Sequence, residues 1–511
     1  MSNQQERFAP LNLPPGVHKQ GTEYQNQGQW FDANGVRWYE KTMGPVGGWR
    51  KVTDTSNVAI QVSGIPRAAH GWKANNGVSW LGIGTTTKLY KYSDGVLDDI
   101  TPGDLTTGGA NSSQGSGAYG RGNYGAGNYG HGTGAQTIVP PGTWQLDNFG
   151  EDLMATLTSD GRILKAAPGD SVAAPITGDA DLPLDIRGLV VTPERFLVAL
   201  GGKQADAVED RRRVAWASQE TTDVWTASDT NSAGNFFLPS KGELLAGRRS
   251  RRQTMLWTDV DVYAMTFIGG TAVYAFEQLG DNCGAISPQA MVVLGDVMFW
   301  MSYGKFFVYD GALKPLECSV LDYVFNDLNQ SERAKIQAIP NTLFDEIVWT
   351  YPSKTQTGRE NDRYVAYNFR EQHWTIGKLA RAAGIDRGVF EYPVWLDPDG
   401  FVYEHEFGDD RTGLVGGVFA ESGPVEIESG TLTARVQRFI PDELSQGDVS
   451  VKLLTRMYPE DVEKVRGPYT LEKITSVRFT ARQARVRIDE VNAVRWRWGI
   501  PRLGWIAGSQ R

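Results

Sequence analysis

The sequence predicts an all-β protein, an irregular β-propeller of about six to seven blades with an additional β platform domain. First, 59 glycines with 16 Trp, 19 Tyr and 20 Phe among 511 residues are typical of short strands joined by tight turns. Second, a pair of apolar strands, often carrying Asp-Gly, recurs along the chain. Third, a helical period occurs at one place, where Leu321, Val324, Phe325 and Leu328 form an apolar stripe after Pro315.

The repeated unit is an apolar strand, a turn and a second strand that carries an aromatic residue. The first copy covers residues 78–84 and 89–95, and the last covers residues 394–400 and 401–403. Copies follow one another at roughly 40 to 60 residues, the spacing of four-stranded blades with insertions. Unrelated hairpins in a sandwich would be equally short but give no reason for the recurring Asp-Gly, so we prefer a propeller. The copies in between begin at residues 152, 195, 254, 297 and 344.

Changes in pattern divide the chain into three parts. Residues 1–50 form an N-terminal arm punctuated by proline and glycine, residues 51–420 hold the propeller, and residues 421–511 form a C-terminal β domain. In this last part, apolar residues alternate with polar ones over residues 477–488, which predicts strands with one apolar and one basic face. A final strand is expected over residues 494–503, where Arg and Trp alternate.

Three tryptophans of the arm, Trp30, Trp38 and Trp49, have no local core to pack on. The apolar face of residues 477–488 needs cover as well. Mutual burial satisfies both requirements, so we expect the arm to pack on the C-terminal domain and to form one platform with it.

Residues 108–134 form a glycine-rich, low-complexity insertion in the propeller. Such a composition cannot bury enough apolar area to offset the loss of backbone entropy, so in isolation it would be a flexible loop. However, Tyr119, Tyr124 and Tyr129 recur every five residues. Glycine lets backbones approach closely and tyrosine offers amphipathic contact area, so we expect an ordered loop near a contact between rings or at a tip.

Composition bears on the class of protein. The longest apolar runs, such as residues 289–294, end within about six to eight residues, whereas a membrane-spanning helix needs about 20. The first residues lack a basic start followed by an apolar stretch, so no secretory signal is expected and synthesis should end in the cytoplasm. Cys283 and Cys318 are interpreted as buried thiols. A net charge of -9 argues against a uniformly basic, nucleic-acid-coating surface, although a local channel could still face DNA.

The chain carries no recognisable catalytic or metal-binding motif, and we predict no enzymatic activity, no cofactor and no metal. Its five histidines are scattered, and HExxH, CxxC, GxSxG and the P-loop motif are absent. On a strand Glu404 and Glu406 share one face and His405 the other, which favours a structural histidine. The Asp-Gly sites at residues 94–95 and 397–400 are explained by turn chemistry rather than calcium loops. A glycosidase that uses carboxylates remote in sequence stays an open alternative.

The strongest run of positive charge is formed by Arg248, Arg249, Arg251 and Arg252. Four neighbouring guanidinium groups repel one another unless carboxylates or phosphates lie nearby. A solvated loop is one interpretation. Because the chain is acidic, we expect carboxylates of a neighbouring subunit to be the counter-charge, with DNA phosphate second. These arginines and the three tyrosines are the candidate interface or DNA-channel residues.

Short segments over most of the chain match the patterns of a known family. In the arm these are Tyr24, Gln29-Trp30-Phe31-Asp32, Val36-Arg37-Trp38 and Pro45-x-Gly47-Gly48-Trp49. Later segments are Leu256-Trp257-Thr258-Asp259, residues 282–288, Phe299-Trp300-Met301-Ser302, residues 307–311, Asp397-Pro398-Asp399-Gly400 and Tyr403-Glu404-His405-Glu406. With these segments the chain resembles the tail nozzle, or tail hub (packaged-DNA stabilisation), proteins of short-tailed bacteriophages.

The resemblance implies a structural virion protein of the phage tail. It would be a subunit of a hexameric nozzle that takes part in head completion, closes the DNA-filled head and conducts the genome at ejection. The implied partners are further copies of the chain (a homohexamer), the head-to-tail adaptor protein, a tail fibre or tailspike, and double-stranded DNA in the channel. No membrane anchor is implied, and assembly takes place in the host cytoplasm. Two alternatives stay open, a carbohydrate-active β-propeller enzyme and a cellular propeller scaffold for protein–protein binding.

Overall fold

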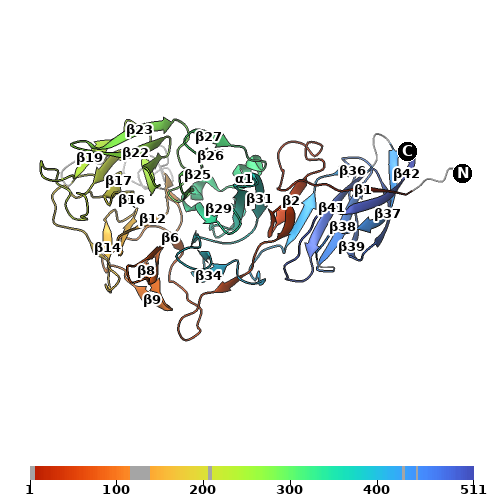
Figure 1. Ribbon diagram of the computed structural model, residues 1–511, viewed down its shortest axis with the longest axis horizontal. Coiled ribbons are helices and arrows are strands. Elements are labelled where there is room, and N and C mark those ends of the chain that lie inside the picture. Colours follow the sequence, from red (N-terminus) through yellow and green to blue (C-terminus); the bar gives the residue numbers. More distant parts are fainter. Residues whose placement is uncertain (1–5, 115–137, 205–209, 428–431, 445–446, 511) are drawn as a thin grey trace, which may run out of the picture.

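The computed structural model describes residues 6–114, 138–204, 210–427, 432–444 and 447–510. Within them, seven four-stranded antiparallel sheets follow one another around a ring, and a domain of two sheets lies beside this ring (Figure 1). The fold is a seven-bladed β-propeller joined to a β-sandwich. The predicted fold class, an all-β propeller with an additional β domain, is confirmed.

Each blade is an antiparallel meander, and its first strand contacts the first strands of neighbouring blades around the axis. Blades 1 to 3 are β6 (Pro66–Lys73), β7 (Ser79–Thr85), β8 (Leu89–Ser93), β9 (Val96–Asp99); β12 (Trp144–Phe149), β13 (Asp152–Leu157), β14 (Leu164–Ala166), β15 (Ala174–Pro175); and β16 (Gly188–Val191), β17 (Leu197–Leu200), β18 (Arg213–Trp216), β19 (Gly234–Phe237). Blades 4 to 6 are β20 (Leu244–Arg249), β21 (Thr254–Thr258), β22 (Val262–Gly269), β23 (Val273–Gly280); β24 (Met291–Leu294), β25 (Val297–Met301), β26 (Phe306–Tyr309), β27 (Leu313–Leu316); and β28 (Gln337–Asn341), β29 (Glu346–Tyr351), β30 (Arg363–Asn368), β31 (His373–Gly377).

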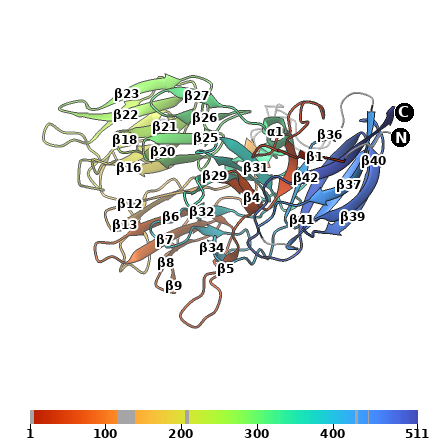
Figure 2. The ribbon, with the colours of Figure 1, turned by 45° about the vertical axis from the view of Figure 1, so that its right-hand side comes forward.

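Blade 7 closes the ring with strands from both parts of the chain. It consists of β32 (Ala383–Ile385), β33 (Val394–Leu396), β34 (Val402–His405) and, at the rim, β5 (Trp49–Lys51). β5 runs antiparallel to β34, with Arg50 opposite Glu404 (Figure 2). β32 in turn contacts β6 of blade 1. The last residues of the expected arm therefore belong to the propeller.

Aromatic side chains fill the space between blades. The second strand of a blade is covered on both faces, so that every residue of β29 is buried. Trp144, Trp257, Trp300 and Trp349 are fully buried, and a tryptophan adds on the order of 150–250 Å² of buried surface. Trp144 lies against Gly84, where a β-carbon would come within 2.3 Å of the indole. This packing explains the high content of aromatic residues and glycine.

The C-terminal domain is a sandwich of two sheets. One has the order β1 (Arg7–Pro10), β42 (Arg502–Gln510), β37 (Leu432–Ile440), β40 (Thr475–Ala481). The other has the order β2 (Trp30–Asn34), β35 (Phe419–Ser422), β41 (Gln483–Glu490), β38 (Val449–Arg456), β39 (Lys464–Thr470), with β36 (Val425–Glu426) also paired to β41. Residues of β40 alternate between buried and exposed, as predicted. The basic residues of β41 are not unpaired, because Arg485 and Arg487 form ion pairs with Glu421 at 3.0 and 3.2 Å.

The arm joins the propeller to the sandwich. It adds β1 to one sheet of the sandwich and β2 to the other, and β5 to blade 7. Between β2 and β5 lies the hairpin β3 (Val36–Tyr39) and β4 (Thr42–Pro45), whose Met43 exchanges backbone hydrogen bonds with Trp498 at 3.0 and 2.7 Å. Trp30 and Trp38 share one hydrophobic core with Trp349 of the propeller and with the sandwich. One hydrophobic core therefore runs from the propeller through the arm into the sandwich.

The helix predicted from the apolar stripe is present as α1 (Leu321–Asp327), with Val324 and Leu328 fully buried, and the 3-10 helix η1 (Gln330–Lys335) follows it. The strand expected over residues 494–503 is wrong in its first part. Residues 494–501 are irregular because their backbone bonds go to Met43 and Asp442, and β42 begins at Arg502. A short ribbon of β10 (Ser113–Gln114) and β11 (Ile138–Val139) completes the described strands.

Candidate functional site

The candidate site lies on the axis of the propeller, where the seven innermost strands surround a channel. Three glutamine side chains cross this channel near the beginning of the strands. They donate through Nε2 to backbone carbonyls of other blades: Gln337 to Arg67 (2.6 Å), Gln145 to Leu245 (2.5 Å) and Gln289 to Trp144 (2.7 Å). The last bond runs from blade 5 to blade 2. Side chains therefore close the channel at this level.

Next to the glutamine layer the channel widens into a cavity of about 350 Å³, which we call the axial pit. Residues of all seven innermost strands, or of the turns beside them, line it. Apolar residues such as Leu146, Val190 and Met291 contribute to its wall. Charged or titratable side chains gather in its lining as well, namely His70, Asp147, Arg248, Arg249, Asp386 and Arg387.

Asp147 lies close to both Arg249 and His70 on one side of the axial pit. Its carboxylate lies 3.3 Å from Nη2 of Arg249 and 3.8 Å from Nε2 of His70. Both groups also donate to Oδ1 of Asn148, at 3.2 and 3.0 Å. Burial lowers the pKa of His70, more than the carboxylate of Asp147 raises it, so this ring is neutral at pH 7. Asp147 therefore pairs mainly with Arg249.

Arg248 is held without a carboxylate. Its Nη1 donates to the carbonyl of Gly247 (2.9 Å), and its Nη2 donates to Pro288 O (3.3 Å) and to Oε1 of Gln289 (2.5 Å). Burial lowers the pKa of Arg248, but an arginine starts from so high a value that it keeps its charge at pH 7. The axial pit thus holds a fixed, partly buried guanidinium group whose partners among the described residues are neutral.

The structure separates the four predicted contact arginines. Arg248 and Arg249 end β20 and reach the axial pit, whereas Arg251 and Arg252 are exposed in the turn before β21. Arg252 lies 3.7 Å from Asp296. Arg249 in the pit lies near Asp147, and Arg252 in the turn lies near Asp296. Part of the counter-charge that we expected from a neighbouring subunit is therefore supplied by the same chain. Contact of the exposed pair with another subunit or with DNA stays a prediction.

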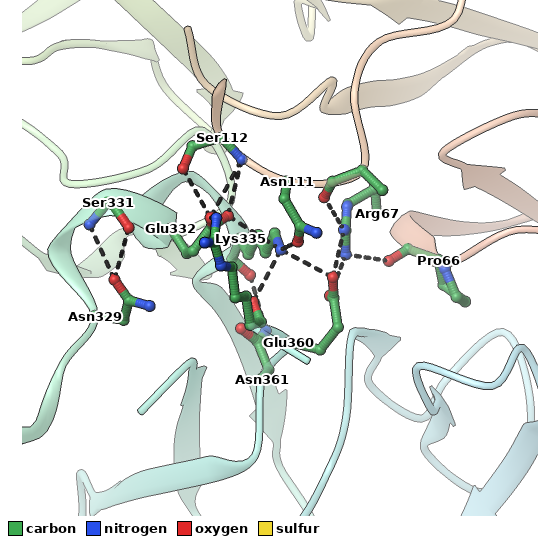
Figure 3. A network of polar contacts seen from close by, with 12 residues as sticks. Pro66, Arg67, Asn111, Ser112, Asn329, Ser331, Glu332, Lys335, Glu360 and Asn361 are labelled. Atoms are coloured by element: carbon green, nitrogen blue, oxygen red, sulfur yellow. Dashed lines mark hydrogen bonds and ion pairs between the residues drawn. The ribbon is translucent and has the colours of Figure 1, made fainter. Parts of the chain in front are cut away.

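A second polar cluster is buried where the innermost strands begin (Figure 3). Lys335 of η1 is fully enclosed and lies 3.1 Å from Glu332 and 2.8 Å from Glu360. Arg67 of β6 donates to both oxygens of Glu360, at 2.7 and 2.9 Å. Burial opposes ionisation of Glu332, but bonds from Ser112 and the charge of Lys335 outweigh it and lower the pKa of this carboxyl. Two cations thus balance two carboxylates in the interior.

This cluster anchors the base of the glycine-rich insertion. Nη2 of Arg67 donates to the carbonyl of Ala110 at 2.8 Å, and the β10–β11 ribbon follows immediately. The insertion therefore leaves the propeller beside an innermost strand. Tyr119, Tyr124 and Tyr129 lie outside the described residues, and their role in contacts stays a prediction.

A third cluster ties the arm to the propeller. The guanidinium of Arg37 donates to both oxygens of Glu346, at 3.2 and 2.9 Å, and to both oxygens of Glu406, at 2.8 and 2.7 Å. Asn341 and the amide of Gly47 also donate to Glu406, at 2.9 and 3.0 Å. Burial raises the pKa of Glu346. In Glu406 the charge of Arg37 and the extra donors outweigh burial and lower the pKa.

The Glu404-His405-Glu406 segment departs from simple strand alternation. β34 ends at His405, and Glu406 has a φ of 63°, so Glu404 points to the surface while Glu406 turns inward. The shared face expected for the two carboxylates is therefore wrong. His405 is stacked between Trp49 and Trp395, with ring centroids 5.1 and 4.2 Å away. Burial and nearby arginines keep the pKa of His405 well below its usual value, as in a structural histidine.

A cleft of about 1320 Å³ lies between the arm, blades 5 and 6, and the sandwich. Trp30, Trp38, Trp374 and Trp498 contribute to its wall. Nδ1 of His373 and Nε1 of Trp498 have no hydrogen-bond partner among the described residues. The cleft is part of the junction between the two domains.

Within the part of the chain that the structure covers, no group of three or more His, Cys, Asp or Glu could hold a metal ion. None of its helices is long and apolar enough to cross a membrane. Cys283 and Cys318 are buried and unpaired, as predicted for structural thiols, and burial raises their pKa to about 11 and about 12.

No family model and no curated protein matches the chain. Similar solved structures include the β-propeller domain of Cps50 (Swd1) from Myceliophteria thermophila, with 8% identity and a TM-score of 0.38 over 67% of this chain and 97% of that chain. The Pan2 WD40 domain from Neurospora crassa has 9% identity and a TM-score of 0.37 over 72% and 97%. The extracellular domain of a one-component system from B. thetaiotaomicron has 10% identity and a TM-score of 0.30 over 65% and 40%.

Sequence reasoning missed the polar residues at the start of the innermost strands. Arg67, Gln145, Gln289 and Gln337 lie within two residues of the first positions of β6, β12, β24 and β28. The sequence does contain a signal for these residues, namely a polar residue at the start of several repeated units. This signal can be recognised only when the first strand of each blade has been located.

Proposed function

We propose that the chain is a structural virion protein, one subunit of a hexameric tail nozzle that closes the DNA-filled head and conducts the genome at ejection. The resemblance of the arm and blade segments to tail nozzle proteins motivates the proposal. The structural observation that carries it is the arm, which adds strands to both sheets of the sandwich and to blade 7.

This arrangement suits a subunit that bears load. Domains joined by a single linker move relative to one another by default. Here, such motion would have to break either the backbone bonds of Met43 with Trp498 or the buried ion pairs of Arg37 with Glu346 and Glu406. Propeller and sandwich therefore behave as one body, which is what the wall of a tube under internal pressure requires.

Exposed apolar side chains on blades 3 and 4 favour contacts with other proteins. Phe236 and Phe237 of β19 and Phe267 and Ile268 of β22 are 39 to 58% exposed. Such residues are available to an interaction surface. In the proposed assembly it would face another copy of the chain, the adaptor, or a tail fibre or tailspike.

The path of DNA in this proposal runs between subunits, inside the hexameric ring. The axis of a single propeller is too narrow, because the side chain of Gln289 alone reaches from blade 5 to blade 2. A duplex has a major groove that is itself about 12 Å wide. The channel of the nozzle and the channel of the propeller are thus different features.

Electron microscopy of the purified full chain over a range of concentrations tests the proposal. Class averages with six copies around an open channel are the expected result, with mass photometry as an independent measure of the copy number. A chain that stays monomeric with and without a phage portal and adaptor complex would refute it. Release of sugars from bacterial surface glycans by that monomer would point to the enzyme alternative.

A further inference from the structure

The axial pit is lined by more arginines than carboxylates, and most of these arginines are not in ion pairs. Arg248, Arg249 and Arg387 line it together with Asp147 and Asp386. Among the described residues, Arg249 is the one of these arginines that forms an ion pair, with Asp147 at 3.3 Å. Asp386 instead accepts hydrogen bonds from the backbone amides of residues 342 and 387. Two arginines of the pit are therefore available for an external anion.

Arg248 is prepared to bind such an anion. Its three hydrogen bonds to Gly247, Pro288 and Gln289 fix the plane of the guanidinium group. They leave the Nε–H and one Nη1–H without a partner among the described residues. A ligand would meet a guanidinium that has already lost its rotamer freedom, so little further ordering is needed on binding.

The wall of the axial pit restricts what can carry the anion. Ala68, Leu189, Val190, Val292 and Ile385 give it an apolar surface, and its volume of about 350 Å³ is at the lower end for a ligand site. Trp, Tyr and Phe do not occur among the residues that line it. Single-stranded nucleic acids bind through stacked aromatic rings and bring one charge per nucleotide, so this pit suits them poorly.

We propose that the axial pit is a peptide-binding site for a carboxylate on an otherwise apolar segment of a partner protein. The carboxylate of an Asp or Glu pairs with Arg248 and Arg387, and apolar neighbours in the peptide contact the wall. The site does not depend on the proposed role in a phage tail, since it follows from the blade interior alone.

Two synthetic peptide libraries test this site with the full chain. One has heptapeptides with a glutamate in the middle and random small or apolar residues on both sides, and the other has glutamine in its place. The immobilised chain should retain peptides of the glutamate library at least about tenfold better, the effect expected for a charge-assisted hydrogen bond. Equal retention of both libraries, or of neither, would overturn the proposal.

Variants then locate the binding. Arg248→Gln should abolish the preference for glutamate, and Arg387→Gln, at an exposed position, should reduce it without disturbing the fold. Arg435→Gln, an exposed arginine of β37 in the sandwich, is the matched control and should retain the preference. Persistence of the preference in both pit variants would contradict the assignment. So would displacement of the best peptide by a short oligonucleotide at lower concentration than by the unlabelled peptide. That result would make the pit a phosphate site.

Discussion

Replacing Arg37 by methionine should detach the arm hairpin from the propeller. The guanidinium makes four hydrogen bonds to two carboxylates, at 2.7 to 3.2 Å, and all three residues are buried. Without it, Glu406 keeps its bonds from Asn341 and the amide of Gly47. For Glu346, the structure shows no other side-chain donor among the described residues. The substitution therefore leaves one buried carboxylate unpaired and a second one weakened.

The expected magnitude follows from this imbalance. Removing one partner of a buried ion pair costs about 3–5 kcal/mol, because the remaining charge has lost its compensation. A loss of about 3 kcal/mol corresponds to a more than hundredfold increase in the population of the open hairpin. Arg50→Met is the matched control. Arg50 also lies in the arm and pairs with a glutamate of β34, but its side chain is 53% exposed, and such pairs are worth about 0–1 kcal/mol.

The pH dependence has a defined sign. In the parent chain the folded pKa of Glu346 is raised, so its contribution is present at low pH and is lost as the pH rises through that value. The folded pKa of Glu406 is lowered, so its contribution is present at neutral pH and is lost as the pH falls. Removing Arg37 raises both folded pKa values. The difference in stability between parent and variant should therefore shrink between pH 7 and about pH 4.5.

Native-state hydrogen exchange of the β3 and β4 amides measures this local opening directly, whereas global unfolding of a chain with several domains violates the two-state assumption. We expect Arg37→Met to exchange at least about thirtyfold faster at these amides than Arg50→Met at pH 7, since the two losses differ by at least about 2 kcal/mol. Exchange rates of the two variants within a few fold of each other would show that the cluster is not what holds the hairpin.

Three further changes test other parts of the structure. Lys335→Met should lower the thermal midpoint by about 3 to 5 °C, because Glu332 loses its buried cation and Glu360 keeps only Arg67, and the exposed control Lys314→Met should not; equal midpoints would refute this. Cys283 should resist thiol reagents at pH 8 in the native chain, since burial raises its pKa to about 11, and rapid labelling would contradict its burial. Arg251→Ala with Arg252→Ala should leave unfolding of the monomer unchanged but reduce ring formation in mass photometry; normal rings at physiological salt would identify a solvated turn.

The hairpins of the blades could be predicted because their signals are local. Residues 152–157 and 254–258, which the repeat marks as strands, coincide with β13 and β21. The closing strand β5 could not be predicted in this way. It has three residues and pairs with β34, about 350 residues later, so neither a period nor a turn marks it.

The polar clusters were harder to predict than the strands. The arginine run was visible as a charge pattern, but the end of β20 places Arg248 and Arg249 at the axis and the others on the surface. Arg37 stands among aromatic residues, and its carboxylate partners lie more than 300 residues away, although Glu40 is only three residues away. A single sequence holds no signal for such a pair, since only the ring closure brings the three groups together.

The closing strand also sets the order in which the molecule can be completed during translation. Residues 49–51 leave the ribosome early, yet their partner strand ends at His405. At about 5–20 residues per second, the roughly 350 residues in between take about 20 to 70 s to synthesise. Throughout that interval the first blades stand as an open arc, and the tryptophans of the arm have nothing to pack on. Nascent chains should therefore stay protease-sensitive in the arm until blade 7 and the sandwich strands that pair with the arm have emerged.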